Sequence, residues 1–329
     1  MFKYRRIPEN PSSVDANRND EVQELGESGK EKELGERTCI TLHFFRHGKK
    51  GKKEVGAPDE PVELTEQGRA EALATGREHP ANTEVAWAAG SPRIRSAHTA
   101  LLRLIGARQD IAEKIKDMSY ADAKKEIKKM LKAGEKVATL PELNFVTDGT
   151  PEFSNAFEHA YETGHALEFM ALESDDLVAK QKDMASLSYS RIAANFASLI
   201  AREMVVGNNF NKLVSSNRDK YIEYNNALER YFGTHHTVPE SFYLKALEKI
   251  TGQRPTPEFM KTYFSDQTGK VNGFDTQEGF TIDIVNQGAT QQLILRGSRG
   301  IPDITLTPKI LAEIIGDAER LDANIENHE

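Results

Sequence analysis

Three adjacent residues, Arg46, His47 and Gly48, have the types that phosphate chemistry needs. The arginine offers a planar fork of N–H donors to phosphate oxygens. The glycine lets the backbone come close to a ligand. A histidine that is held neutral and aimed at phosphorus can act as a nucleophile. The motif therefore predicts a phosphate site, although three residues alone also suit an exposed basic turn.

Strands and helices must position this motif. The run 40–45 alternates and is rich in β-branched and aromatic residues, which is typical of a strand ending at the motif. A helix is predicted over 65–79, with a threonine as its N-cap. A second strand is predicted over 84–90, and the helix predicted over 92–106 has proline at its first position. These elements would carry the motif to one edge of a sheet.

Three blocks of this sequence, in their order, resemble the histidine phosphatase superfamily, in its phosphoglycerate mutase-like branch. The blocks are Arg46-His47-Gly48, Leu64-Thr65-x-x-Gly68-x-x-x-Ala72 and Ser91-x-x-x-Arg95-x-x-x-Thr99-Ala100. The resemblance implies a three-layer α/β sandwich, with a mostly parallel central sheet and helices on both faces. It also implies a site at the carboxyl ends of the strands, as in open α/β sheets.

The same resemblance implies roles for the residues of these blocks. His47 would attack phosphorus and form a phosphohistidine, while Arg46 and Arg95 would bind the phosphate. Arg93 is a rival of Arg95 by charge alone. Spacing favours Arg95 and leaves Arg93 to the rim of the pocket or to an ion pair.

The resemblance also implies a second histidine, the last of the phosphate ligands, at a strand end just before a helix. His235 matches this context best, and His236 stands where the family usually has glycine, so either can serve. Gln287 lies in a superficially similar stretch and would mean that the second histidine is lost. A helix is predicted after His235 and a strand after Gln287, which favours His235.

Glu142 is the expected proton donor, because Leu140-Pro141-Glu142 resembles a Leu-x-Glu stretch of the mutase-like branch. A carboxyl group at a strand tip near apolar neighbours can have a raised pKa and stay protonated for the leaving group. Asp148 and Glu240 are rivals, and a glutamate facing solvent is the alternative reading.

Two departures from the family pattern bear on function. Lys49 and Lys50 follow the Arg-His-Gly motif, where the family commonly has Glu and Thr, and Glu71 replaces a usual Gln. The lysines can attract a phosphorylated substrate, but a carboxylate that mutases tend to keep is missing. We therefore expect metal-independent phosphomonoester hydrolysis through a phosphohistidine on His47. A phosphoglycerate mutase-type phosphotransferase and a non-catalytic phospho-ligand binder are the alternatives.

The rest of the chain suggests one domain with appendages. Residues 1–37 are polar and predict a disordered tail before a histidine phosphatase-like domain over 38–329. Residues 150–190 predict a helical insertion or cap, where substrate choice can be encoded. Two alternating runs within 278–297 predict a β-hairpin.

Composition narrows the classes of function. The chain has 329 residues, a net charge of −8 and a single cysteine, Cys39. An acidic protein is a poor general nucleic-acid binder, and one cysteine allows neither an internal disulfide nor a Cys-based zinc site. No apolar run of membrane-spanning length occurs. We expect a cytoplasmic protein without cofactor or metal, acting on a phosphorylated small molecule or a phosphoprotein. The sequence does not predict the oligomeric state.

Overall fold

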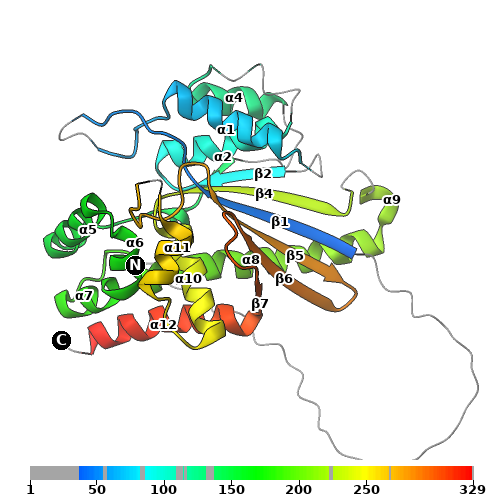
Figure 1. Ribbon diagram of the computed structural model, residues 1–329. Coiled ribbons are helices and arrows are strands. Elements are labelled where there is room, and N and C mark those ends of the chain that lie inside the picture. The colour runs from blue at the N-terminus through cyan, green and yellow to red at the C-terminus, as the bar shows by residue number, and fades with distance from the viewer. Residues whose placement is uncertain are drawn as a thin grey trace, which may run out of the picture.

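A seven-stranded sheet forms the middle layer of the protein (Figure 1). The computed structural model describes residues 37–327 apart from 55–57, 82–85, 109–113, 115–116, 131–136, 222–224 and 267. The strands lie in the order β3-β2-β4-β1-β5-β6-β7. Their bounds are β1 Arg37–Arg46, β2 Ala86–Gly90, β3 Val137–Thr139, β4 Ala227–Thr234, β5 Gly279–Gln287, β6 Thr290–Gly297 and β7 Ile304–Leu306.

The sheet is parallel in one half and antiparallel in the other. β3, β2, β4 and β1 run parallel, whereas β5, β6 and β7 each run antiparallel to the preceding strand of the sheet. The prediction of a mostly parallel sheet is therefore only partly confirmed. The predicted hairpin over 278–297 is confirmed as the antiparallel pair β5 and β6, and it accounts for part of this difference. Its turn at 288–289 is short, and short turns join antiparallel strands.

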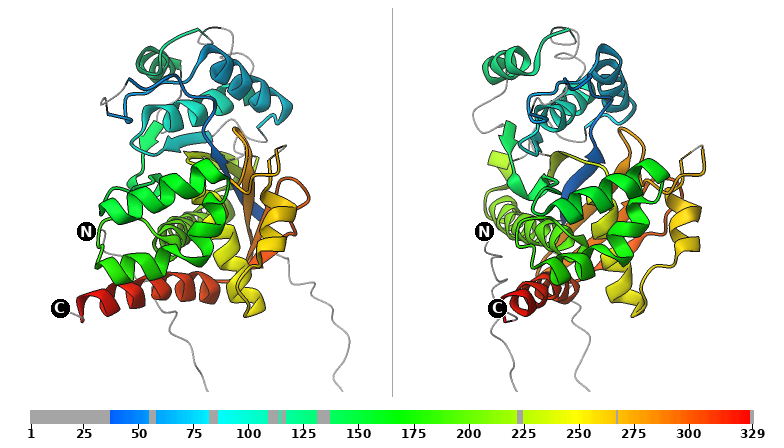
Figure 2. Two further views of the ribbon diagram at one scale, coloured as in Figure 1. Left: turned by 60° about the vertical axis from the view of Figure 1, so that its left-hand side comes forward. Right: turned by 90° about the vertical axis from the view of Figure 1, so that its left-hand side faces the viewer.

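Helices cover both faces of the sheet and complete the predicted three-layer sandwich (Figure 1; Figure 2). α1, α2 and α4 form one outer layer, and α8, α10 and α12 lie on the other side of the sheet. The helices, including one short 3-10 helix, η1, are α1 Glu66–Glu78, α2 Ile94–Ala107, α4 Tyr120–Met130, η1 Pro141–Leu143, α5 Pro151–Thr163, α6 Ala166–Leu172, α7 Ser174–Gln181, α8 Tyr189–Ser216, α9 Arg218–Tyr221, α10 Val238–Thr251, α11 Pro257–Phe264 and α12 Pro308–Glu326.

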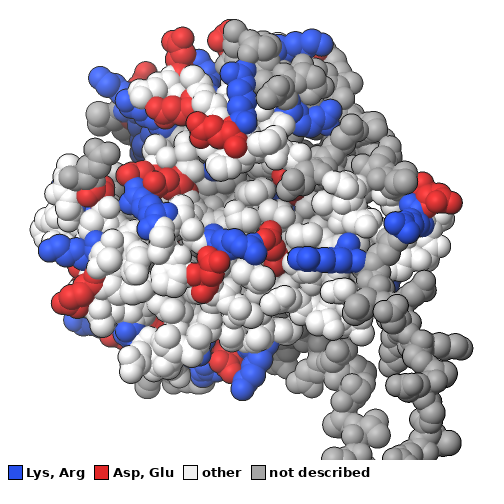
Figure 3. All heavy atoms as spheres, turned by 45° about the vertical axis from the view of Figure 1, so that its right-hand side comes forward, with Lys and Arg blue, Asp and Glu red and all other residues white. Residues whose placement is uncertain are grey.

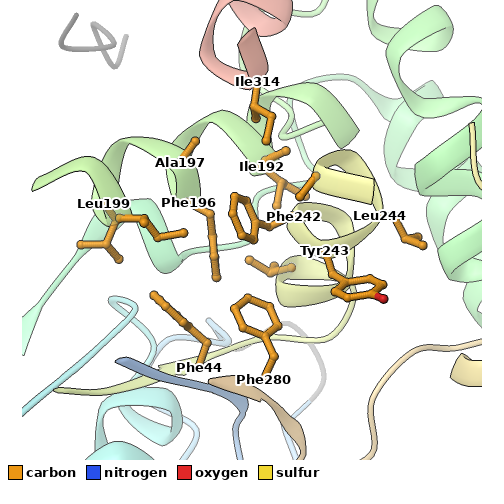
Figure 4. Packing of buried hydrophobic residues seen from close by; sticks show 14 of the residues in the cluster. Phe44, Ile192, Phe196, Ala197, Leu199, Phe242, Tyr243, Leu244, Phe280 and Ile314 are labelled. Atoms are coloured by element: carbon orange, nitrogen blue, oxygen red, sulfur yellow. The ribbon is translucent and has the colours of Figure 1, made fainter. Parts of the chain in front are cut away.

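Buried phenylalanines fix β1 beneath α8 and α10 (Figure 4). The ring centroids of Phe44 on β1 and Phe196 on α8 lie 5.0 Å apart, and Phe196 lies 5.7 Å from Phe242 on α10. Phe280 on β5 completes the group, 5.4 Å from Phe44. Burying one phenylalanine side chain stabilises a fold by about 1.5–3 kcal/mol. The strand that precedes His47 is therefore held firmly by the core.

Three further sequence predictions concern the ends and appendages of the domain. The predicted tail over 1–37 lies outside the described residues except for Arg37, the first residue of β1. The range 150–190 contains α5, α6 and α7, and its role as a cap stays a prediction. In the described part of the chain, no helix combines the length and apolar character that crossing a membrane needs. On the face drawn in Figure 3, acidic and basic side chains are interspersed.

Candidate functional site

Two parallel strands bring His47 and His235 to the same edge of the sheet. Arg46 pairs with Thr234 at the ends of β1 and β4, so the residue after each strand is a histidine at the same height. The backbone N–H of His47 donates to the carbonyl of Thr234 at 2.9 Å. The two imidazole centroids lie 5.3 Å apart. The carboxyl ends of the strands thus build the expected histidine pair.

Close packing of α2 against the strand ends places Arg95 beside these histidines. A Cβ on Gly233 would lie 2.0 Å from the carbonyl oxygen of Ser96, so only glycine allows this approach. The Ser96 hydroxyl donates to the Gly233 carbonyl at 2.5 Å. Arg95 is buried in the first turn of the helix, and its Nε–H donates to His47 Nε2 at 3.1 Å. The helix N-terminus adds further partial positive charge at this edge.

His47 is held in the tautomer that a nucleophile needs. Its Nδ1–H donates to the carbonyl of Gly48 at 2.7 Å, which leaves the Nε2 lone pair facing Arg95. Burial and the nearby Arg95 charge lower the pKa of His47 to about 3. The imidazole is therefore neutral at ordinary pH, and its reactive nitrogen is turned toward a cationic group.

The other family-like residues support the turn that carries His47. The Gly48 N–H donates to the Thr99 hydroxyl at 3.0 Å, and that hydroxyl donates to the carbonyl of Arg95 at 2.8 Å. Thr65 is confirmed as the N-cap of α1, because its hydroxyl accepts from the Gly68 N–H at 3.0 Å. A Cβ on Gly68 would lie 2.4 Å from the Lys49 carbonyl. These residues therefore fix the backbone on either side of His47.

Both candidate second histidines line the site, in different settings. His235 Nε2 lies 2.5 Å from the hydroxyl of Ser91, whereas its Nδ1 is buried without a hydrogen-bond partner. The ring of His236 meets that of Tyr161 edge-on at 5.2 Å. Burial holds the pKa of both histidines well below the usual range. His235 is the one that lies against His47, in the position that the sequence favoured.

Asp59 contacts the cationic side chains of the site, although no sequence pattern indicated this contact. Its carboxylate accepts from Arg95 Nη2 at 2.5 Å and from Arg93 Nη1 at 2.9 Å, and lies 3.3 Å from Lys50 Nζ. Its backbone carbonyl accepts from Arg95 Nη1 at 2.8 Å. Although burial alone would raise it, the pKa of Asp59 is lowered, chiefly by the hydrogen bond and charge of Arg95. The carboxylate therefore remains ionised and accepts a hydrogen bond from Nη2 of Arg95.

These residues surround a cavity of about 380 Å³ with one cationic and one aromatic wall. Its lining contains several cationic side chains and three histidines, but no carboxylate among the described residues. The aromatic wall consists of Phe145, Phe157 and Tyr161, and the last two belong to α5. The complete lining is Arg46, His47, Gly48, Lys49, Lys50, Arg93, Arg95, Phe145, Phe157, Tyr161, His235, His236 and Thr276.

Of four further sequence candidates, one lines the cavity and three do not. Glu142 does not line the cavity, and its carboxylate accepts from Arg202 Nη1 on α8 at 2.5 Å. Asp148 is exposed. Gln287 ends β5, where it pairs with Arg37 at the opposite end of β1 from His47. Arg93 lines the cavity and forms the ion pair with Asp59, which matches the role expected for it.

Comparisons with known proteins give weak matches. No family model matches the chain, and no curated protein matches it significantly. A mycobacterial glucosyl-3-phosphoglycerate phosphatase structure is 14% identical, with a TM-score of 0.37, over 76% of this chain and 91% of that one. A candidate alpha-ribazole-5′-P phosphatase from Escherichia coli is 16% identical, with a TM-score of 0.34, over 80% and 98%. Because these scores are low, family and function are inferred from the residues of the site.

Proposed function

We propose that this chain is a histidine phosphatase that hydrolyses phosphomonoesters through a phosphohistidine on His47. The observation that carries the proposal is the neutral, oriented His47 in a cavity lined by Arg46, Arg95 and His235. A phosphate dianion would neutralise this group of cations. The ordered sequence blocks that resemble the family supply independent support for the same roles.

The first step transfers the phosphoryl group to the protein. His47 Nε2 attacks phosphorus and forms an N–P bond, while the bond from phosphorus to the ester oxygen breaks and the alcohol leaves with a proton. The donors of Arg46, Arg95 and His235 bind the other phosphate oxygens and stabilise their charge in the transition state. Before this step, Arg95 must exchange its contact with His47 Nε2 for the phosphate.

The second step releases the phosphate. Water attacks phosphorus, loses a proton to a base, and the N–P bond breaks to restore neutral His47. The hydrogen bond from Nδ1 to Gly48 keeps the ring in the same orientation through both steps. No step requires a metal ion, since the arginines supply the positive charge.

Two carboxyl groups are candidates for moving the proton. Glu142 is the one that the Leu-x-Glu stretch suggests, and its carboxylate must first leave Arg202 to reach a substrate. Asp59 already contacts Arg93 and Arg95 at the cavity, but these arginines hold it ionised. We propose Glu142 for this role, with Asp59 as its rival.

Hydrolysis of p-nitrophenyl phosphate in excess EDTA tests the proposed function. We expect turnover that resists the chelator and is lost in His47→Ala. The matched control is His159→Ala, because His159 is exposed on α5 and does not line the cavity. Acid quenching during turnover should trap a phosphohistidine in the parent protein. Turnover that survives in His47→Ala would refute the mechanism.

A non-catalytic phospho-ligand binder is the second candidate. Two contacts favour it. The Asp59 carboxylate accepts a hydrogen bond from Arg95, and Glu142 is bound to Arg202 outside the cavity. Such a protein would bind inorganic phosphate with Arg46 and Arg95 but show no turnover of p-nitrophenyl phosphate from acid to neutral pH. A phosphoglycerate mutase would instead pass the phosphoryl group from its phosphoenzyme to an acceptor alcohol.

A further inference from the structure

Glu240 is a completely buried carboxyl group next to the site that the proposed reaction does not use. It belongs to the first turn of α10 and has no exposed surface. Its Oε1 accepts from the backbone N–H of Phe274 at 2.5 Å, and its Oε2 has no hydrogen-bond partner. Burial raises the pKa of Glu240 to about 7. A buried carboxyl group is costly to retain without a specific role.

The backbone around Gly273 is shaped to meet this carboxyl group. Gly273 has a φ of +93°, which side-chain-bearing residues rarely adopt. A Cβ at this position would lie 2.3 Å from Glu240 Oε1. The backbone of residues 273–274 therefore lies directly against the Glu240 carboxyl group, and the hydrogen bond from the Phe274 N–H holds it there.

The other side of the same segment holds Arg46. The carbonyl of Phe274 accepts from Arg46 Nη1 at 2.8 Å, while Arg46 Nε is buried without a partner. Among the described residues, the Phe274 carbonyl is the hydrogen-bond acceptor of this guanidinium. Arg46 lines both the 380 Å³ cavity and an adjoining cavity of about 250 Å³, so it has open space on two sides. Without this anchor, its side chain could turn away from the phosphate.

We propose that Glu240 is a positioning residue that aims Arg46 at the phosphate by anchoring the N–H of Phe274. The proposal rests on the proposed function for its consequence in turnover, but its geometric part concerns the free protein. The link runs from the carboxylate through one backbone residue to the guanidinium. This positioning requires a hydrogen-bond acceptor at the place of Glu240 Oε1, but it does not require a negative charge on the Glu240 side chain.

Two variants of similar size separate the acceptor from simple packing. Glu240→Gln keeps an oxygen that can accept from Phe274, whereas Glu240→Leu removes it. Glu203→Leu is the matched control, because Glu203 is another buried carboxyl group, on α8, that pairs with Arg230 and does not line either cavity. Thermal unfolding identifies any variant that fails to fold.

Two properties are measured for each variant. The first is NMR of the Arg46 guanidinium in protein labelled at arginine, where slow exchange of its Nη groups reports a held side chain. The second is the affinity for inorganic phosphate by calorimetry. We expect Glu240→Leu to speed the Arg46 exchange and weaken phosphate binding by about tenfold or more. Glu240→Gln and Glu203→Leu should stay within about threefold of the parent protein.

The two readouts distinguish the possible failures. Unchanged Arg46 exchange in Glu240→Leu, or equal changes in the Gln and Leu variants, would overturn the positioning role. A parent protein that binds no phosphate would count against the proposed function, whereas the NMR comparison would still decide whether Glu240 holds Arg46.

Discussion

Asp59 and Arg95 are joined by two hydrogen bonds that use both ends of the arginine fork. The carboxylate of Asp59 accepts from Nη2 and its backbone carbonyl accepts from Nη1, while Nε of Arg95 donates to His47. Each of the three guanidinium nitrogens of Arg95 thereby donates one hydrogen bond in the free protein. A substrate phosphate must compete with Asp59 for this arginine, because both are anions that seek the same donors.

Replacing Asp59 should therefore strengthen phosphate binding. In Asp59→Asn, the loss of one negative charge leaves Arg93 and Arg95 available, and we expect the Kd for inorganic phosphate to fall by about tenfold. Calorimetry measures the change, and Asp219→Asn on α9 provides a control for the loss of one remote charge. A higher Kd in Asp59→Asn would instead show that Asp59 holds Arg95 in its working orientation.

Leaving-group dependence tests the role of Glu142. If it supplies the proton, Glu142→Gln should lower turnover of phenyl phosphate by about 10²–10⁴-fold and that of p-nitrophenyl phosphate much less, because nitrophenolate leaves without help. Arg202→Gln is the companion variant, since it frees the Glu142 carboxylate without removing it. Equal losses for both esters in Glu142→Gln would remove it from this role. The same comparison of phenyl phosphate with p-nitrophenyl phosphate in Asp59→Asn would then test whether Asp59 supplies the proton.

The pH dependence of kcat/KM should reflect the low pKa of His47. This pKa is about 3 because burial and Arg95 disfavour the protonated ring. As the pH falls, the free protein keeps a neutral nucleophile until the pH approaches this value, and protonation then removes activity. After correction for ionisation of the substrate phosphate, the acid limb should lie below about pH 4. A limb near the ordinary histidine pKa of about 6.5 would contradict this assignment.

The aromatic wall predicts a preference among leaving groups. Phe157 packs against Phe145 with ring centroids 4.9 Å apart, and both line the cavity together with the cationic residues. Phe157→Ala should raise KM for p-nitrophenyl phosphate by about tenfold, because the substitution removes apolar protein surface against which the nitrophenyl ring of the substrate can pack. The KM for acetyl phosphate, whose leaving group is small, should change little. Parallel changes for both substrates would indicate a general distortion of the site.

Local sequence patterns were sufficient to predict the strand before His47 and the helix cap that supports it. A threonine that caps a helix and a strand that ends in Arg-His-Gly depend on neighbouring residues, and the structure contains both. His235 was predictable because it follows a strand and precedes a helix. The hairpin was predictable for the same reason, since its turn and alternating strands are local features.

Contacts between distant segments were not accessible in this way. Asp59 lies in a connection after β1, and no spacing rule links it to Arg95, 36 residues later. The partner of Glu142 is Arg202, which depends on how α8 packs beside η1. Aromatic residues of α5 carried a helical pattern that fits burial as well as a cavity wall, so their place had to come from the tertiary fold.

The position of β1 has a consequence for the order in which the candidate site is assembled during synthesis. This strand pairs with β4 on one side and β5 on the other, although they follow it by nearly 190 and 240 residues. Contacts of such long sequence separation form late, since the entropy of closing large loops must be overcome first. A nascent chain that has not yet emerged as far as residue 287 contains His47 and Arg95, but the edge of β1 that pairs with β5 is still open. His47 and Arg95 thus lie early in the chain, and the strands that pair with both edges of β1 are translated much later.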